Sequence, residues 1–236
     1  MGYCVAIVLA AGRGKRMGQA VPKQFLEIDG KPIIYYSLKQ MEESFIDEII
    51  LVTGEDDVSY CQKEIVEKYG FRKVHHVIAG GKERYHSVYN GLKAAECCDY
   101  VFIHDGARPF INEEILKRNL EMVEKCDACV TGMPVKDTIK VSDENNFVAQ
   151  TPHRNLLWQI QTPQTFRYDI VKNAYDSLFE VLSLGELKCE VTDDAMVVEQ
   201  FGSQKVKLVE GDYRNIKLTT PEDMILAEAF LKNLQN

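Results

Sequence analysis

The sequence predicts an α/β protein with a single doubly wound, mainly parallel sheet. Four short apolar runs carry this prediction, because uninterrupted runs of this kind are typical of strands that are covered on both faces. Segments with the helical period separate the runs, so strand and helix alternate. A chain of 236 residues is also long enough to bury the core that such a sheet requires.

The first half of the chain supplies the elements of this sheet in order. We expect strands at residues 5–9, 48–53, 74–79 and 100–104. Helices with an apolar face are expected at 33–41, 58–69 and 86–95. A further helix at 112–125 leads to a strand at 128–133, which extends the sheet.

The regular alternation stops at a segment with the pattern of a hairpin. Residues 137–142 and 147–150 flank the polar turn 143–146, and the whole projecting arm covers 136–155. An isolated two-stranded hairpin is only marginally stable in water, so the arm is expected to pack on something else. We predict that it packs on a second copy of the chain and forms a homodimer.

The last part of the chain completes the fold. A helix at 168–181 and a strand at 206–209 precede a closing helix, which Pro221 begins with Thr220 as its N-cap. Neither internal repeats nor a long linker divides the sequence. We therefore expect a single domain over residues 1–236.

The composition excludes several classes of protein. The chain has 28 basic and 36 acidic residues, and a net charge of −8 argues against generic binding to nucleic acid or to an anionic membrane. Its apolar runs are far shorter than the roughly 20 residues that span a bilayer, and its N-terminus lacks the pattern of a signal peptide. The seven cysteines are scattered like reduced thiols, so we expect a cytoplasmic protein. Cys126 and Cys129 have the spacing of a metal pair, but without a second pair we interpret them as buried thiols.

A basic, glycine-containing loop follows the first predicted strand. Gly12 and Gly14 allow tight turns and expose backbone N–H groups, while Arg16 and Lys23 add positive charge. Ligands of open α/β sheets bind at the carboxyl ends of the strands, so this loop is a candidate phosphate site. Met17 stands where a dinucleotide fingerprint needs its third glycine, and no P-loop string is present. A triphosphate is the ligand that this loop favours.

Further motifs follow the loop in a fixed order. They are Gly80-Gly-Lys-Glu-Arg-Tyr-His-Ser-Val88, His104-Asp-Gly-Ala-Arg-Pro-Phe110, Arg154-Asn-Leu-Leu-Trp158 with Gln161-Thr-Pro-Gln164, Thr192-Asp-Asp-Ala195, and Asn215-Ile-Lys217 before Thr220-Pro-Glu-Asp223. With the loop motif, this set resembles the 2-C-methyl-D-erythritol 4-phosphate cytidylyltransferase family of Rossmann-like nucleotidyltransferases. The resemblance covers nearly the whole chain.

The resemblance implies a reaction between CTP and the sugar-alcohol phosphate, with Mg²⁺ or another divalent cation as cofactor. In-line attack of the acceptor phosphate on the α-phosphorus would release pyrophosphate in the non-mevalonate route to isoprenoids. The residues implied as catalytic are Arg16, Lys23 and Lys217. Those implied in nucleotide binding are Ala10, Ala11, Gly12, Gly14, Gly80, Gly81, Arg84, Ser87 and Asp105.

The acceptor side has its own implied residues. Asp105, Arg108, Arg154 and Thr162 match positions that bind the acceptor in the family, and Asp105 is also the candidate metal ligand. An arginine suits phosphate because its planar fork donates two parallel hydrogen bonds. The acceptor phosphate is already ionised at pH 7, so no general base is needed. Gly106 departs from the alanine that many relatives carry, and we expect it to affect backbone freedom only.

Other functions fit the sequence less well. A ribitol 5-phosphate cytidylyltransferase would share the glycine loop, the Gly80 motif and the arm, although residues 192–195 and 215–217 are closer to the methylerythritol enzymes. A catalytically inactive nucleotide sensor or dimeric scaffold would need affinity but not charges placed for a transition state. A nicotinamide dehydrogenase fails at Met17 and lacks the acidic residue about 20 positions beyond the loop.

Overall fold

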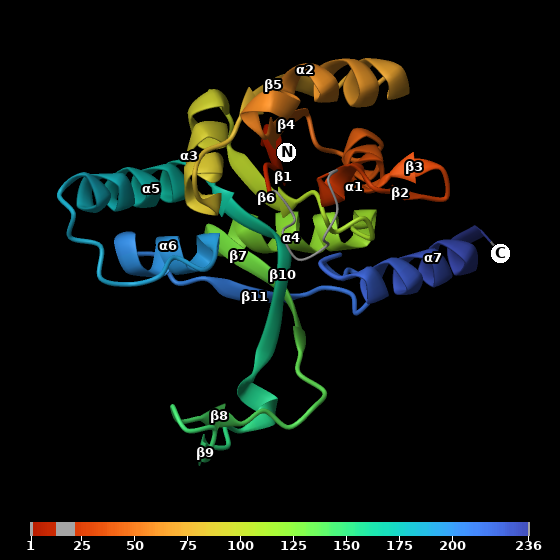
Figure 1. Cartoon of the computed structure of the whole chain (residues 1–236). Helices are drawn as coiled ribbons and strands as arrows, with labels where there is room; N and C mark the ends of the chain where they lie inside the picture. The colour runs from red at the N-terminus through yellow and green to blue at the C-terminus, as the bar shows by residue number, and fades with distance from the viewer. Residues whose placement is uncertain (1, 13–21, 236) are drawn as a thin grey trace.

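The structure, a computed structural model, describes residues 2–12 and 22–235. At its centre, within these residues, lies a sheet of seven strands in the order β11-β7-β10-β6-β1-β4-β5 (Figure 1). The strands are β1 (Cys4–Ala10), β4 (Glu48–Thr53), β5 (Val74–Ala79), β6 (Tyr100–Asp105), β7 (Ala128–Pro134), β10 (Trp158–Arg167) and β11 (Lys207–Glu210). The predicted α/β fold is confirmed.

The first strand lies in the middle of the sheet and organises its pairing. Ile7 of β1 lies opposite Ile50 of β4 and Ile103 of β6, and both pairings are parallel. The strands β4 and β5 are also parallel, as are β7 and β11. Only β10 within this sheet runs antiparallel to its neighbours, β6 and β7. The carboxyl ends of β1 and β6 therefore meet at one edge of the sheet.

Helices cover both faces of the sheet, as a doubly wound fold requires. The longer helices are α1 (Ile33–Glu42), α3 (Arg84–Ala94), α4 (Glu113–Cys126), α5 (Tyr168–Ser183), α6 (Asp194–Phe201) and α7 (Pro221–Gln235). The alternation of side chains along β1 assigns the layers: Val8 packs with α1 and α4, whereas Ile7 packs with α3, α5 and α6. Both side chains are fully buried, so each layer has its own apolar core.

Shorter elements connect these layers. They are β2 (Glu27–Ile28), β3 (Lys31–Pro32), α2 (Val58–Tyr60) and the 3₁₀ turns η2 (Lys23–Phe25), η3 (Glu55–Asp57) and η5 (Arg154–Leu156). The helix predicted at 58–69 is present, but its middle, η4 (Cys61–Glu67), is a π-helix. Helix α4 begins at the side chain of Asn112, which accepts from the N–H of Ile115 at 2.9 Å.

Strand β10 and helix α6 were not predicted from the sequence. The alternation of apolar and polar residues does not reveal this strand, because polar residues occupy its buried positions. These residues are Gln161, Thr162, Gln164 and Thr165. Each has a hydrogen-bond partner, and Gln164, for example, donates to Asp193 at 3.0 Å. Tertiary partners therefore replace the apolar alternation that normally marks a strand.

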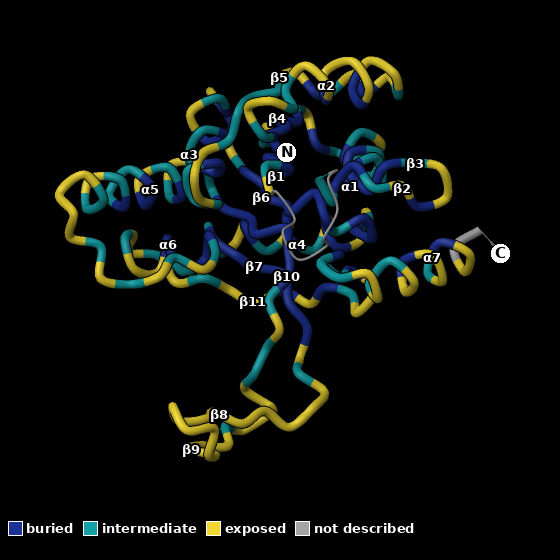
Figure 2. The backbone as a smooth tube through the Cα atoms, in the orientation of Figure 1, coloured by how far each residue is buried: buried dark blue, intermediate teal, exposed yellow. Residues whose placement is uncertain are grey.

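The hairpin arm projects from the body of the molecule and is exposed along most of its length (Figures 1 and 2). Its paired strands, β8 (Val141–Ser142) and β9 (Val148–Gln150), are shorter than predicted, although they are antiparallel as expected. A two-stranded ribbon has little apolar surface to bury by itself, which explains the short ladder.

The C-terminal helix packs beside the sheet on a small apolar cluster of its own. This cluster joins Ala227 and Leu231 of α7 to Ile33 and Phe110. The helix begins at Pro221 as predicted, and Asp223 accepts from the N–H groups of Thr219 and Thr220. Within the described part of the chain, each helix is too short or too polar to cross a membrane.

Candidate active site

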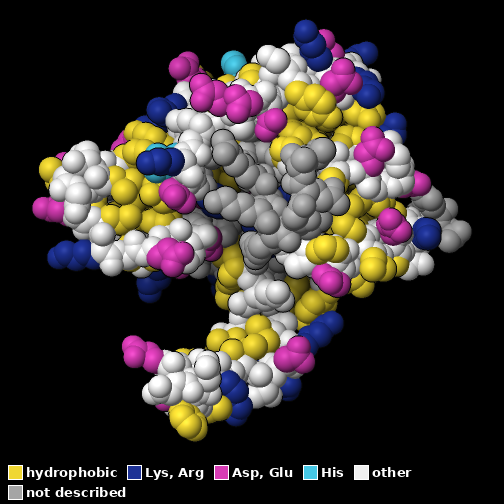
Figure 3. Space-filling view, in the orientation of Figure 1, with side chains coloured by type: hydrophobic (Ala, Val, Ile, Leu, Met, Phe, Trp, Pro, Cys, Tyr) yellow, Lys and Arg dark blue, Asp and Glu magenta, His cyan; other side chains and the backbone are white. Residues whose placement is uncertain are grey.

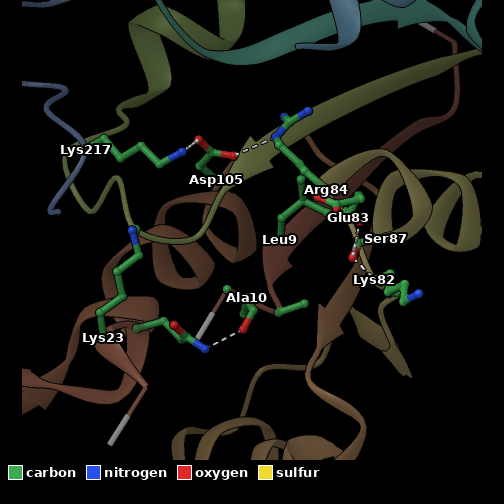
Figure 4. A pocket seen from close by; sticks show the side chains of 14 residues that line it. Leu9, Ala10, Lys23, Lys82, Glu83, Arg84, Ser87, Asp105 and Lys217 are labelled. Carbon is green, nitrogen blue, oxygen red and sulfur yellow. Dashed lines mark hydrogen bonds and ion pairs between the residues drawn. The ribbon is translucent and has the colours of Figure 1, made fainter. Parts of the chain in front are cut away.

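A cavity of about 670 Å³ opens at the carboxyl ends of β1 and β6 and beside the start of α3 (Figure 4). This is the edge of the sheet at which open α/β folds bind ligands. The cavity is lined by Leu9, Ala10, Ala11, Gly12, Lys23, Gln24, Gly81, Lys82, Glu83, Arg84, Ser87, Asp105, Ala107 and Lys217. Segments far apart in the sequence therefore form its wall.

The glycine loop enters this wall from β1. Ala10, Ala11 and Gly12 follow the strand directly and line the cavity. The other two predicted residues of the loop, Gly14 and Arg16, lie outside the described residues. In the described part of the loop, the backbone therefore lies at the edge of the cavity, which is where a ligand could be reached as predicted.

The predicted nucleotide residues after β5 form a close-packed turn. Gly81 donates its backbone N–H to the hydroxyl of Ser87 at 3.1 Å. A Cβ on Gly80 would lie only 2.5 Å from that hydroxyl oxygen and 2.8 Å from the Cβ of Ala11. A side chain at position 80 would thus push apart the two segments that flank the cavity.

Asp105 lies between two cations at the end of β6 (Figure 4). Lys217 Nζ lies 2.7 Å from its Oδ2, and Arg84 Nε lies 3.4 Å from its Oδ1. Burial alone would raise the pKa of Asp105, but Arg84, Lys217 and Arg108 together hold it well below its usual range. Asp105 is therefore ionised at neutral pH and draws two positive side chains to the cavity.

Arg84 is itself held from behind by a buried carboxylate. Its two terminal nitrogens donate to the two oxygens of Asp194, each at 2.7 Å, and Tyr175 donates to Asp194 at 2.6 Å. Burial opposes the charge of Arg84, yet Asp194 and Asp105 raise the pKa of Arg84 well above its usual value. This parallel geometry fixes the guanidinium plane and leaves Nε–H directed at Asp105.

Lys23 extends into the cavity from the turn η2. Its ammonium donates to the carbonyl of Leu218 at 3.1 Å, beside the segment that carries Lys217. The next residue, Gln24, is buried and donates to the carbonyl of Ala10. This contact ties η2 to the end of β1, so the lysine and the glycine loop share one wall.

Arg108 and Thr162 lie behind Asp105, where β10 pairs with β6. Arg108 donates to the carbonyl of Asn215 at 2.7 Å, and the hydroxyl of Thr162 accepts from the N–H of Asp105 at 3.1 Å. His104 lies against both residues, and burial lowers the pKa of His104 to about 4 despite the nearby charge of Asp105. The imidazole is therefore neutral at pH 7.

Arg154 is the one predicted site residue of the described chain that lies on the projecting arm. It is exposed and donates to the carbonyl of Lys136 at 3.0 Å, also on the arm. It does not line the cavity of its own chain. The remaining described residues of the predicted site gather around or behind that cavity.

A family model, 2-C-methyl-D-erythritol 4-phosphate cytidylyltransferase, matches residues 4–233. The chain belongs to this family. A cytidylyltransferase of this name from Lachnospira eligens is 53% identical over 96% of this chain and 98% of the relative. One from Lachnoclostridium phytofermentans is 48% identical over 98% of this chain and 97% of the relative.

Solved structures agree with this membership. The 4-diphosphocytidyl-2C-methyl-D-erythritol synthase of Anaerococcus prevotii is 36% identical, with a TM-score of 0.84. The match covers 98% of this chain and 96% of the other. The resemblance to the methylerythritol phosphate cytidylyltransferase family inferred from the ordered motifs is therefore confirmed.

Three residues that sequence reasoning left without a role belong to the architecture of this cytidylyltransferase site. Asp194 and Tyr175 hold Arg84, and His104 contacts both Thr162 and Arg108. Asp194 and His104 stand inside motifs of the cytidylyltransferase family, which was the available signal. Their partners lie in distant parts of the sequence, so no spacing indicated the contacts.

The expectation for Gly106 was wrong. A Cβ at this position would overlap Ile34 Cδ1 and would lie 3.0 Å from the carbonyl oxygen of Leu9. An alanine would therefore require α1 or its Ile34 side chain to move, rather than changing backbone freedom alone. In this member of the cytidylyltransferase family, Gly106 permits close packing between α1 and the edge of the site.

Proposed function

We propose that this chain transfers the cytidylyl group of CTP to 2-C-methyl-D-erythritol 4-phosphate. The products are 4-diphosphocytidyl-2-C-methyl-D-erythritol, an intermediate of the non-mevalonate isoprenoid pathway, and pyrophosphate. One observation carries the proposal: Arg84 and Lys217 pair with the ionised carboxylate of Asp105, and Lys23 lines the same cavity at the end of β1. The names of the relatives over nearly the full chain support the same reaction.

Electrostatic stabilisation is the main task of such a site. Negative charge builds on the α-phosphorus oxygens and on the departing pyrophosphate as the acceptor phosphate attacks in line. Lys23, Lys217 and Arg16 would oppose this charge, with Arg16 lying outside the described residues. The acceptor oxygen is already anionic, so positioning replaces the work of a general base.

The nucleotide would lie between the glycine loop and the turn after β5. Backbone groups of Ala10, Ala11 and Gly12 line one side of the cavity, and Gly81 and Ser87 line the other. Donor and acceptor groups of a pyrimidine left unpaired here would cost about 1–3 kcal/mol each, which gives useful selection among bases. Gly80 keeps the second side close to the first, because a Cβ at this position would meet both Ser87 and Ala11.

The acceptor would lie on the side of Asp105 that faces β10. Arg108 and Thr162 are placed behind that carboxylate, and Arg84, held by Asp194, orients it rather than extending freely toward a ligand. We therefore propose Arg84 as a residue that serves both halves of the site. Its hydrogen bonds with Asp105 and Asp194 support a bracing role more directly than contact with the nucleotide.

The cavity residues fit a divalent cation in one arrangement, in which the carboxylate of Asp105 shares the ion with the substrate phosphates. Within the described residues, no group of three or more His, Cys, Asp or Glu side chains is placed to hold a metal ion. Mg²⁺ commonly keeps several waters and binds one or two carboxylates together with substrate phosphates, and Asp105 is a carboxylate of this kind in the cavity. We propose that Asp105 holds Mg²⁺ with the CTP phosphates, where the ion would neutralise part of their charge.

We further propose a homodimer in which the arm completes the partner's site. Large apolar side chains on the arm and directly after it are 40–79% exposed, namely Ile139, Val141, Phe147 and Val148 on the arm and Leu156 next to its end. Figure 3 shows hydrophobic surface on the arm among charged side chains. Such surface on a thin ribbon favours a protein partner, and Arg154 on the same arm is remote from its own cavity.

Two broader expectations also stay proposals. We treat residues 1–236 as one nucleotidyltransferase domain with its arm at 136–155, which agrees with the single central sheet. We infer a cytoplasmic location, because all seven cysteines are free thiols and such a set persists best in a reducing compartment.

The direct test is pyrophosphate release from CTP and Mg²⁺ with two acceptors in parallel. We expect turnover with 2-C-methyl-D-erythritol 4-phosphate and much less with ribitol 5-phosphate, the alternative that the relatives' names do not favour. Equal or reversed activity would overturn the choice of acceptor. Nucleotide binding without turnover of either acceptor would favour a sensor instead.

A further inference from the structure

His104 is the last residue before Asp105 on β6, and its side chain is completely buried. Its ring contacts two residues of the proposed acceptor half. Both contacts are hydrogen bonds, so packing in an apolar core does not explain them. Nε2 lies 3.1 Å from the carbonyl oxygen of Arg108, and Nδ1 lies 3.0 Å from the hydroxyl oxygen of Thr162. The imidazole thus bridges the turn after β6 to strand β10.

The direction of these hydrogen bonds follows from the partners. A carbonyl oxygen only accepts, so Nε2 must carry a hydrogen and donate to Arg108. In the neutral ring Nδ1 is then an acceptor, and the hydroxyl of Thr162 donates to it. The same hydroxyl accepts from the N–H of Asp105 at 3.1 Å. One ring nitrogen therefore fixes the rotation of the Thr162 hydroxyl, and the other fixes the carbonyl of Arg108.

We propose that His104 is a positioning residue for the sugar-phosphate half of the reaction, acting by orienting Thr162 through Nδ1. The inference rests on the proposed function, in which Thr162 and Arg108 lie behind Asp105 and support it on the acceptor side. His104 does not line the cavity, so it acts through its neighbours. Its contacts do not extend to Gly81 or Ser87, so the pyrimidine half of the cavity is independent of it.

Two substitutions separate the two ends of the ring. An asparagine amide at position 104 can place an acceptor near the position of Nδ1, whereas a glutamine amide reaches the position of Nε2. His104→Asn therefore keeps an acceptor for Thr162, and His104→Gln keeps only a donor for Arg108. Both variants remove the ring and leave a buried amide, so they are matched in their general cost to the core.

Steady-state kinetics gives the test. For His104→Gln we expect the KM for 2-C-methyl-D-erythritol 4-phosphate to rise about tenfold, the effect of one lost well-aligned hydrogen bond, with the KM for CTP within about twofold of wild type. His104→Asn should raise the acceptor KM by less than about threefold. Equal acceptor KM values in the two variants, or equal changes in both substrates' KM values, would overturn the proposal, because a purely structural histidine predicts that result.

Ser37 supplies the matched control for the Arg108 end. Its hydroxyl is buried and donates to the same Arg108 carbonyl at 3.1 Å, with no contact to Thr162. Ser37→Ala should leave the KM for the acceptor within about twofold of wild type, although it removes a buried hydrogen bond. If Ser37→Ala raised the acceptor KM as much as His104→Gln does, the Arg108 carbonyl would be the cause of the effect. That result would contradict a role through Thr162.

Nitrogen-15 spectra test the network without any turnover. The protonated and unprotonated nitrogens of a neutral imidazole resonate far apart, so the tautomer of His104 is directly observable. We expect the Nε2–H form at pH 7, and Thr162→Val should move the Nδ1 resonance while Ser37→Ala does not. An Nδ1–H form would overturn the inference. A wild-type protein without activity on the sugar phosphate, but with this spectrum, would instead overturn the proposed function.

Discussion

Asp105 shares its two oxygens between Lys217 and Arg84, and the two cations differ in their freedom. Arg84 is locked by the bidentate contact with Asp194, whereas Lys217 is 38% exposed and has a flexible stem. A triphosphate entering the cavity would therefore recruit Lys217 more readily than Arg84. In the proposed reaction, Asp105 would hold the lysine in place until phosphate oxygens replaced it as the partner.

Replacing Lys217 with methionine tests this charge at nearly constant side-chain length. We expect kcat to fall by about 10²-fold or more, because a positive group aimed at developing charge is lost. The free energy of unfolding should change little, since Arg84 still pairs with Asp105. Pyrophosphate release and urea denaturation measure the two quantities. Lys39→Met, which removes an exposed lysine 3.9 Å from Glu43, is the control, and a normal kcat for Lys217→Met would remove this lysine from the mechanism.

His104 predicts a pH dependence of stability. Its pKa in the folded chain is about 4, below the ordinary value of 6.5, so the unfolded chain binds more protons between these values. The stabilisation is complete above pH 6.5 and is lost as the pH falls toward 4, by up to about 3 kcal/mol. Denaturation at pH 7 and pH 5 checks this. His104→Asn cannot titrate, and an equally steep loss in that variant would show that other groups cause it.

Residues of the site were predictable where a motif ends a strand. Lys23, Asp105 and Lys217 line one cavity, as expected from the carboxyl ends of parallel strands and the segments beside them. The partners of Arg84 and His104 were not predictable. Arg84 meets Asp194 across 110 positions of sequence, and such a pairing depends on how α3 and α6 pack on the same face of the sheet.

Elements were predicted best where apolar periodicity is strong. The strands β1, β4 and β6 were found at almost their observed bounds, because each is an apolar run buried on both faces. Strand β10 was missed, since its buried polar side chains hydrogen-bond to partners in other parts of the chain instead of forming an apolar pattern. These same polar groups bring Thr162 beside Asp105. The element that sequence patterns could not find is thus one that builds the proposed acceptor side.

Helix α6 braces the site through Asp194, and a comparison with Asp176 measures that contribution. Each carboxylate accepts from a tyrosine hydroxyl and from a cation, but Asp194 is fully buried whereas Asp176 is 44% exposed. We expect Asp194→Asn to lower the free energy of unfolding by about 3–5 kcal/mol, because it removes the fully buried, bidentate counter-charge of Arg84 and leaves only the 3.4 Å contact with Asp105. Asp176→Asn should cost at most about 1 kcal/mol.

Urea denaturation gives both values, and the kinetics of the folded fraction separate stability from function. With Arg84 no longer fixed, Asp105 loses its second orienting contact, so Asp194→Asn should also lower kcat/KM while Asp176→Asn does not. Similar losses of stability in the two variants would mean that the Arg84 contact is no stronger than an exposed pair.

At the scale of the whole molecule, the arm separates Arg154 from the cavity of its own chain. The arm is exposed and carries open apolar side chains, and the side chain of Arg154 donates to the carbonyl of Lys136 on the same arm. If the arm docks on a second copy, each cavity receives its Arg154 from the partner. A closed, two-fold symmetric pair would then contain two composite sites.

Mixing two inactive variants decides whether Arg154 acts across the interface. Lys23→Ala damages the cavity, and Arg154→Ala damages the arm, so each homodimer should be nearly inactive. A heterodimer formed by unfolding and refolding the two chains together would contain one site with both residues intact, if Arg154 crosses to the partner. An equal mixture should then recover about one quarter of wild-type activity, since half of the dimers are mixed and each has one good site. No recovery, with mixed dimers demonstrated by mass spectrometry, would place Arg154 in its own chain's site. A wild-type protein that stays monomeric in light scattering would overturn the arm's proposed role altogether.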